Sequence, residues 1–498
     1  MELSSCQKAI NEAYLNTNSN ITIQAGAGSG KTSTLLMLAK NTPLWKKSIF
    51  LCFNKSIQQE LAEKLPPHIN SSTLHSLGMK QLLSHFHVNL KVNEIKTFSL
   101  IVKEKSIDLS KFNTKKKQNA YLFGLCKLWD LYRINLLEDL SCMEEIALQN
   151  DLIITEKELQ DMEIVIRVMN TYNSHLQNGS YIDFTDMLYL CRYISKENFK
   201  QYDIVMIDEC QDLSAVQKMI VDKIIKPGGR FIAVGDENQS IYAFVGSNIR
   251  SFQAFKEASN TVNLPLNITY RCAKKIVDEA NSIFDGMIAF EKNPEGSVLG
   301  KIITKEDGSI IGMRGDVFEA EAGDLIICRN NGPLVELFLE FLKRRKLAHI
   351  YGKDIGEGLQ KTLELVGDIP GDQVGPLLEI QYEELIQELI EKGIFNPHNH
   401  QKATSFREKI DMILLLLKHY GSVRALEEGF KTIFSNESGK GITLMSIHKS
   451  KGLEADKVWF YKPELLPSKY AQSEDMLRAE KCLYYVAVTR ARNTLIYC

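Results

Sequence analysis

Residues 25–32 read Ala-Gly-Ala-Gly-Ser-Gly-Lys-Thr and decide the fold of this 498-residue chain. The apolar run Ile21–Gln24 precedes them, and a helical pattern of leucines begins at Leu35. This order of strand, glycine-rich loop and helix matches the phosphate-binding P-loop. In such a loop the main-chain N–H groups turn towards phosphates, Lys31 reaches the β and γ phosphates, and Thr32 can ligate Mg²⁺. The sequence therefore predicts a nucleotide site.

An acidic pair, Asp208 and Glu209, directly follows the apolar run Asp203–Ile207. Ligands of open α/β sheets sit at the carboxyl ends of the strands, so we expect this pair at that edge. Asp208 can hold Mg²⁺ through water, and Glu209 can orient and deprotonate an attacking water. An isolated acidic pair is most often a solvated turn, but a buried strand and a P-loop in the same chain favour a catalytic site.

Eight short apolar runs are typical of strands that are buried on both faces of a parallel sheet. They are Ile21–Ala25, Ser48–Phe53, Asp203–Ile207, Arg230–Val234, Asp324–Cys328, Ile442–Ile447, Lys457–Tyr461 and Thr494–Tyr497. They fall into two groups, and a long stretch with helical periodicity interrupts each group. We therefore predict an α/β fold with two parallel-sheet cores, each carrying a mainly helical insertion.

The predicted domains follow from these groups. They are 1–84 and 174–265 for the first core, 85–173 for its insertion, 266–353 and 440–498 for the second core, and 354–439 for its insertion. The first insertion shows helical spacing at Leu122, Leu125, Leu128 and Leu131.

Composition restricts where the chain can bind its partners. The 60 Lys and Arg nearly cancel the 62 Asp and Glu, so any nucleic-acid site must be local. The ten cysteines form no C-x-x-C pair and are typical of buried thiols in a reducing compartment. The longest apolar run, Met412–Leu417, is far too short to span a membrane. We expect a cytoplasmic protein, nuclear if eukaryotic, with no membrane partner.

Six further segments accompany the P-loop in a fixed order. They are Gln7, Asp-Glu-Cys-Gln-Asp at 208–212, Val-Gly-Asp-Glu-Asn-Gln-Ser-Ile-Tyr at 234–242, Tyr270-Arg271, Ser-Ile-His-Lys-Ser-Lys-Gly-Leu-Glu at 446–454, and Tyr-Val-Ala-Val-Thr-Arg-Ala-Arg at 485–492. With these motifs the chain resembles superfamily-1 DNA helicases of the UvrD/Rep/PcrA type. The interval from Arg271 to Thr443 is short, so it resembles a compact member.

The resemblance implies two RecA-like P-loop NTPase cores that use ATP and Mg²⁺. Gln7 would read the adenine edge, Gln239 would sense the γ-phosphate, and Arg490 would be the arginine finger. The implied catalytic residues are Lys31, Glu209, Gln239, Arg271 and Arg490. The implied nucleotide-binding residues are Gln7, Ala25, Gly26, Ala27, Gly28, Ser29, Gly30, Lys31, Thr32, Tyr270 and Glu454, and the implied metal ligands are Thr32 and Asp208.

A track for single-stranded DNA is also implied, because such sites combine aromatic faces with phosphate donors. Its residues are Phe53, Asn54, His75, Phe184, Tyr242, Phe244 and His448. The chain reads Phe244-Val245-Gly246 where the family reads Trp-Arg-Gly. The smaller ring should still stack, at a loss of up to about 1 kcal/mol of the roughly 1–3 kcal/mol typical per base. The missing arginine removes one link between the DNA and the nucleotide.

The expected function is that of an ATP-dependent DNA helicase that moves 3′ to 5′ on single-stranded DNA and unwinds duplex, in repair or replication. Its expected partners are single strands, duplex junctions and a replication or repair protein. One alternative is a superfamily-1 motor of opposite polarity or one acting on RNA, against which the segments Leu453–Asp456 and Asp183–Asp186 count. Another is a non-catalytic nucleic-acid-binding subunit, which would be expected to lack some of the nucleotide-site residues.

The two insertions differ in charge. Residues 85–133 carry ten bases and four acids, a balance of +6, whereas 354–439 carry a balance of −7. Lys and Arg supply most phosphate contacts, so we expect the first insertion to contact duplex DNA. The second is expected to regulate closure of the cores or to meet a protein partner.

Overall fold

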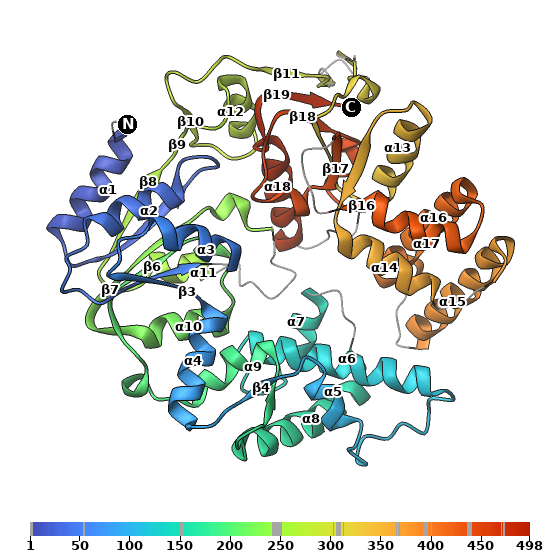
Figure 1. Ribbon diagram of the computed structural model, residues 1–498, viewed down its shortest axis with the longest axis horizontal. Helices are drawn as coiled ribbons and strands as arrows, with labels where there is room; N and C mark the ends of the chain where they lie inside the picture. The colour runs from blue at the N-terminus through green and yellow to red at the C-terminus, as the bar shows by residue number, and fades with distance from the viewer. Residues whose placement is uncertain are drawn as a thin grey trace. The chain divides into compact units, whose positions relative to one another are not determined.

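The first of two units, Met1–Asn267, is built on a six-stranded sheet (Figure 1). Its strands lie in the order β3 (Ile69–Thr73), β2 (Ser48–Cys52), β6 (Tyr202–Ile207), β7 (Ile225–Gly235), β1 (Asn20–Ala25) and β8 (Thr261–Leu266). All neighbouring pairs run parallel. The carboxyl ends therefore meet at one edge, and β7 lies between the strand that leads into the P-loop and the strand that leads into Asp208.

The structure is a computed structural model. It describes residues 3–52, 55–149, 154–241, 251–301, 303–304, 310–311, 313–364, 366, 369–391, 397–399, 401–435, 441–469, 471 and 474–498.

Both faces of this sheet are covered, which explains its nearly continuous apolar strands. Along β6, Ile204 and Met206 join a core with α1 (Ser5–Asn16) and α2 (Lys31–Lys40), whereas Val205 and Ile207 join a second core on the other face. Helices α4 (Leu74–Phe86), α10 (Ala215–Ile224) and α11 (Ser251–Lys256) contribute to that second core.

A run of helices lies between β3 and β6 in the chain. Its elements are β4 (Lys91–Val92), α5 (Lys96–Ile101), α6 (Lys115–Ile134), α7 (Met143–Gln149), α8 (Glu156–Ser174), β5 (Tyr181–Ile182) and α9 (Phe184–Tyr189). The periodic leucines from Leu122 to Leu131 are buried, and they belong to the same apolar core as Val205 and Ile207 of the sheet. The helices and the sheet of this unit therefore share one core.

The second unit, Ile268–Cys498, has a seven-stranded parallel sheet. Its order is β11 (Ser297–Leu299), β19 (Ala491–Tyr497), β18 (Ala455–Phe460), β14 (Leu325–Cys328), β17 (Ile442–Ser446), β15 (Ala348–Tyr351) and β16 (Phe434–Ser435). Its principal helices are α12 (Lys274–Asn281), α13 (Gly332–Lys343), α14 (Lys353–Leu363), α15 (Gly371–Glu391), α16 (Gln401–Tyr420), α17 (Val423–Ile433) and α18 (Glu474–Val488). Helices α13 to α17 share one apolar core with this sheet.

The predicted α/β class with two parallel-sheet cores is confirmed, and each of the eight predicted strands forms. The prediction of buried thiols is wrong at Cys142, whose side chain is exposed, whereas the other cysteines are buried or half-buried and all ten are free. Within the described ranges, no helix combines the length and the apolar character needed to cross a membrane.

Candidate functional site

The P-loop presents unfilled hydrogen-bonding capacity at the start of α2. Gly30 is the N-cap of this helix at φ +83°, a conformation that glycine adopts without strain, and no side chain caps the first turn. The hydroxyl of Ser29 is buried and has no hydrogen-bond partner. Uncapped N–H groups at a helix N-terminus bind anions, so the loop is suited to a phosphate.

Lys31 pairs with the acidic residue that follows β6. Its Nζ donates to Oε2 of Glu209 over 2.8 Å, and the two side chains are 13% and 29% exposed. Burial alone would lower the pKa of Lys31, but the neighbouring carboxylates, Glu209 foremost, outweigh burial and raise it to about 12. Lys31 therefore stays charged at any physiological pH.

Glu209 itself has a strained backbone. Its φ is +52°, in the left-handed region that a residue with a Cβ rarely adopts. Such strain costs about 1–3 kcal/mol and is concentrated at functional sites. It allows the chain to leave β6 and place the Glu209 carboxylate beside Lys31.

Thr32 and Asp208 form a second contact across the same edge. The Thr32 hydroxyl donates to Oδ2 of Asp208 over 2.7 Å. Burial, with a further contribution from Glu209, raises the pKa of Asp208. Mg²⁺ prefers oxygen ligands such as a hydroxyl and a carboxylate. A nearby cation would also stabilise the ionised form of the buried Asp208 carboxylate. No group of three or more His, Cys, Asp or Glu suited to a metal occurs in the described part of the chain, so a Mg²⁺ ion here would need water or phosphate ligands as well.

The end of β7 adds a carboxylate that the sequence analysis did not assign. Asp236 is fully buried, and burial raises its pKa to about 6. The Gln239 amide donates to its Oδ2 over 2.6 Å. The Gln211 amide connects the two loops, because its Nε2 donates to Glu209 over 2.7 Å while its Oε1 accepts from the Asp236 N–H over 3.1 Å.

Gly235 makes that connection possible, because a Cβ at this position would lie 2.7 Å from Oε1 of Gln211. Both Gln211 and Asp236 stand inside the quoted motifs. Their meeting depends on β6 and β7 being neighbours in the sheet, which only the observed strand order reveals.

Gln7 lies beside the P-loop helix and uses both ends of its amide. Its Oε1 accepts from the Ser4 N–H over 3.1 Å in the capping box of α1, and its Nε2 donates to the Thr34 hydroxyl over 3.2 Å. Recognition of an adenine edge by Gln7 would exchange these bonds.

The second unit brings Arg271 and Glu454 into an ion pair. Arg492 also contacts Glu454, over 2.7 Å. Burial would raise the pKa of Glu454, but Arg271 and Arg492 hold it below its ordinary value. Tyr270 packs against Phe290 with ring centroids 4.9 Å apart.

Arg490 has different surroundings, with only 1% of its surface exposed. Its guanidinium donates to the main-chain carbonyls of Val486 over 3.1 Å and Leu453 over 3.0 Å. These bonds fix the segment that leads into Glu454.

Of the predicted DNA contacts, Phe53, Asn54, Tyr242 and Phe244 lie outside the described residues. His75 and Phe184 meet edge to face, with ring centroids 6.2 Å apart, and the Phe184 side chain is 52% exposed.

The two predicted histidines are both neutral at pH 7. Burial lowers the pKa of His75. Burial, helped by Arg329, lowers the pKa of His448 to about 4. Neither imidazole therefore offers a positive charge to a phosphate.

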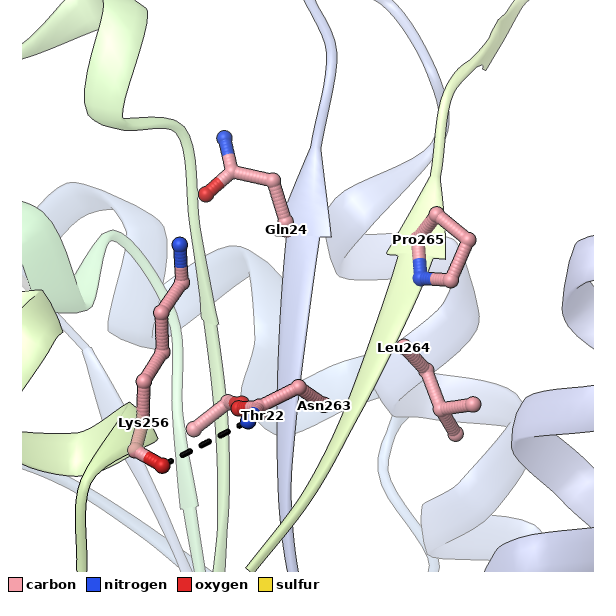
Figure 2. Close-up of a pocket in the computed structure, with 6 residues that line it drawn as sticks. All are labelled: Thr22, Gln24, Lys256, Asn263, Leu264 and Pro265. Atoms are coloured by element: carbon pink, nitrogen blue, oxygen red, sulfur yellow. Dashed lines mark hydrogen bonds between the residues drawn. The ribbon is translucent and has the colours of Figure 1, made fainter.

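A hollow of about 240 Å³ lies beside β1, on the side opposite the core that holds Ile21 and Ile23, and Figure 2 shows the residues that line it. Its lining residues are Thr22, Gln24, Lys256, Asn263, Leu264 and Pro265. None of these is among the predicted nucleotide-site residues.

Two domain models match the chain. The UvrD/REP helicase N-terminal domain matches residues 6–260, which is just over half of the chain, and the UvrD-like helicase C-terminal domain matches residues 379–498. DNA helicase II from Rickettsia typhi is 22% identical over 97% of this chain and 90% of its own length. ATP-dependent DNA helicase Rep from Buchnera aphidicola is 22% identical over 66% and 52%. F-box DNA helicase protein 1 from Schizosaccharomyces pombe is 24% identical over 99% and 57%.

Proposed function

Because the chain belongs to the UvrD/REP helicase family, we propose that it uses ATP to move 3′ to 5′ along single-stranded DNA and to unwind duplex DNA. Family membership makes it an ATP-hydrolysing helicase. The direction of movement, the tracking of a single strand and the use of Mg²⁺ are our proposals.

The observation that carries the ATP-dependent part of the proposal is the excess of negative charge at the edge of the first sheet. One lysine, Lys31, faces the carboxylates of Asp208, Glu209 and Asp236, two of which have raised pKa values. Ionised together, these groups carry a net charge near −2. A divalent cation bound with a nucleotide would neutralise this charge, and the uncapped start of α2 would receive the phosphates.

The Lys31–Glu209 pair suggests how binding prepares the chemistry. A γ-phosphate competes with Glu209 for Lys31, so the arrival of ATP frees the Glu209 carboxylate to accept a proton from water. During this exchange, the hydrogen bonds of Gln211 to Glu209 and to the Asp236 N–H would keep the two loops in contact. Thr32 and Asp208 would hold Mg²⁺, which supplies Lewis-acid stabilisation of the phosphate oxygens when it is bound.

The second unit would supply the remaining positive charge. We assign Arg271 and Arg490 to the developing charge on the γ-phosphate, and Glu454 to the ribose. Tyr270 would stack on adenine, Gln7 would read its edge, and Gln239 would report the presence of the γ-phosphate.

We propose that Phe184 and His75 in the first unit and His448 in the second unit contact the DNA strand. Phe53, Asn54, Tyr242 and Phe244 complete the proposed track. We propose that the domains have the extents predicted from the sequence. We also propose that the protein acts in the cytoplasm or the nucleus and that a replication or repair protein is its partner.

ATP turnover with and without oligo(dT), followed by unwinding of duplexes with a 3′ or a 5′ tail, tests the proposal. We expect oligo(dT) to stimulate turnover at least 10-fold and only the 3′-tailed duplex to be unwound. Unwinding of the 5′-tailed duplex would reverse the polarity. Stimulation by RNA alone would favour the RNA motor, and strand binding without turnover would identify a non-catalytic subunit.

A further inference from the structure

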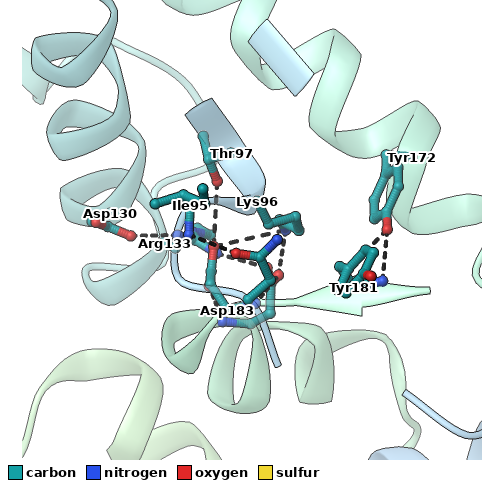
Figure 3. Close-up of polar contacts among 10 residues, drawn as sticks. Ile95, Lys96, Thr97, Asp130, Arg133, Tyr172, Tyr181 and Asp183 are labelled. Carbon is teal, nitrogen blue, oxygen red and sulfur yellow. Dashed lines mark hydrogen bonds and ion pairs between the residues drawn. The ribbon is translucent and has the colours of Figure 1, made fainter. Parts of the chain in front are cut away.

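A second cluster of charges is buried away from the nucleotide site, where α5, α6 and α9 meet (Figure 3). It contains Lys96, Arg133, Asp183 and Asp186, whose side chains are 2%, 1%, 7% and 0% exposed. The two cations balance the two buried carboxylates, and a third carboxylate that pairs with Arg133, that of Asp130, is half exposed to solvent. None of the four is accessible to a nucleic acid.

Arg133 is the centre of the cluster. Its guanidinium donates to Asp183 over 2.7 Å and to Asp186 over 2.6 Å, and it also pairs with the half-exposed Asp130 one turn earlier. Lys96 pairs with Asp186 and lies 3.8 Å from Asp183.

The contacts link two parts of the chain. Lys96 starts α5 and Arg133 lies in the last turn of α6, both within the predicted insertion, whereas Asp183 and Asp186 form the capping box of α9. Asp183 accepts from the Asp186 N–H over 2.8 Å, and Asp186 accepts from the Asp183 N–H over 3.0 Å. The insertion therefore holds the two residues that define where α9 begins.

The first residue of α9 is Phe184, between the two aspartates, and it is half exposed. The α6 helix reaches its other neighbour as well, because the Thr185 side chain interacts with Asp130 and lowers the pKa of that carboxyl group, against the burial that raises it. Insertion side chains thus bind the residues on both sides of the phenylalanine. Buried ion pairs contribute little net stability but do fix geometry, so this arrangement is better suited to orientation than to strength.

We propose that Lys96 and Arg133 are positioning residues for Phe184, so that the helical insertion sets the affinity for single-stranded DNA without contacting the strand through these side chains. This inference rests on the proposed function of Phe184 as a stacking platform. A ring must face the base squarely to stack, and the capping box sets the direction in which Phe184 leaves the helix.

A double-mutant cycle tests the inference. The concentration of oligo(dT) that half-saturates ATP turnover would be measured for the wild type, Arg133→Met, Phe184→Ala and the double variant. We expect both single variants to raise this concentration about 10-fold, in line with the loss of one stacked base. The double variant should be no worse than Phe184→Ala, and in Arg133→Met the turnover without DNA and the KM for ATP should stay within twofold of the wild type. Arg133→Lys keeps the positive charge but loses the forked guanidinium group. Its half-saturating concentration of oligo(dT) should therefore lie between those of the wild type and Arg133→Met.

Lys157→Met is the matched control. Lys157 pairs with Asp161 over 2.7 Å on α8, within the same insertion. We expect its half-saturating concentration to equal that of the wild type. If Arg133→Met does not fold, Asp130→Asn, at a half-exposed member of the cluster, takes its place in the cycle with an expected rise of about 3-fold.

Three results would overturn the inference. If Phe184→Ala leaves the half-saturating concentration unchanged, the assigned function of Phe184 fails and the inference fails with it. If Phe184→Ala raises that concentration but the cluster variant does not, only the inference fails. A double variant in which the two effects multiply would show that Arg133 acts independently of Phe184.

Discussion

Two clusters of charged side chains in the first unit use the same residue types in opposite ways. At the sheet edge, Lys31 faces three carboxylates and remains partly exposed. At the start of α9, two buried cations face two buried carboxylates, and the third carboxylate of the cluster, Asp130, is half exposed to solvent. A cluster whose buried charges are already paired inside the protein orients the elements around it, whereas one that lacks positive charge is suited to receive it from outside. Charge balance and exposure thus separate a binding site from a structural one, and four predictions test that separation.

The largest effect is expected at Lys31. Lys31→Ala should reduce ATP turnover by at least about 10²–10³-fold, because it removes the charge that meets the phosphates. Glu209→Gln should reduce turnover comparably while ATP binding stays within a few-fold, because only the proton acceptor is lost. Nucleotide binding by equilibrium titration and steady-state hydrolysis would be measured separately. Hydrolysis near the wild-type rate in Glu209→Gln would remove that residue from its assigned role.

The arginines of the second unit extend the comparison. Arg271→Ala and Arg490→Ala should each lower kcat by about 10³-fold with a smaller effect on nucleotide affinity, since each would act on transition-state charge. They should differ in stability. Loss of Arg490 leaves buried carbonyls unpaired, at a cost of about 2–3 kcal/mol, whereas the partly exposed Arg271–Glu454 pair should contribute less than about 1 kcal/mol.

Urea unfolding of both variants, beside single-turnover kinetics, would measure these two effects. Weak nucleotide binding with a normal kcat in either variant would argue against its assignment to the γ-phosphate.

The stability of the two clusters should respond with opposite sign to the same change. Asp186→Asn should lower the free energy of unfolding by about 3–5 kcal/mol, because it leaves buried positive charge uncompensated. Asp208→Asn should leave it unchanged or raise it by about 1 kcal/mol, because it removes one of several crowded carboxylates. Urea unfolding in a chelating buffer without nucleotide measures both. A loss of stability in both variants would end the distinction between the clusters.

The smallest effect concerns the basic residues of the first insertion. Two of its ten counted bases, Lys96 and Arg133, are internal, whereas Lys115 and Lys117 at the start of α6 are exposed. Replacing Lys115, Lys116 and Lys117 by Ala should weaken binding to a tailed duplex several-fold and reduce its salt slope by up to about three, one for each lysine. Turnover stimulated by single strands should persist.

Lys96→Met is the contrasting variant, because its charge is already neutralised inside the protein, and its salt slope should equal that of the wild type. The assignment of the insertions would be reversed by two results together. The triple variant would keep the wild-type salt slope, and charge changes in residues 354–439 would alter that slope.

The sequence predicted most of the central strands, although it missed the interior strand β15, and it predicted the edge strands poorly. Strands β2 and β6 are buried on both faces, so they read as apolar runs. The edge strands β3 and β8 were missed, because an edge strand needs less apolar surface: β3 reads Ile-Asn-Ser-Ser-Thr, and β8 contains Pro265.

The same limit applies to the sites. The P-loop and the acidic pair are local motifs, and their contacts, Lys31 with Glu209 and Thr32 with Asp208, join elements that the motifs already named. The place of Asp236 depends on strand order, and the Arg133 cluster depends on packing between segments about fifty residues apart. A tally of charge in a sequence window cannot tell an internal arginine from an exposed one.

The apolar core that the helices α5 to α8 share with the first sheet has a consequence for how the protein opens. Segments that share a core tend to unfold as one cooperative unit. Native-state hydrogen exchange should therefore show the amides around Leu125 and Trp129 opening with the same free energy as those of Val205 and Ile207, rather than as an earlier, separate event. For the same reason, a shortened chain without residues 85–173 would expose the apolar side chains of α9 and α10 that pack against α6, and would be expected to aggregate.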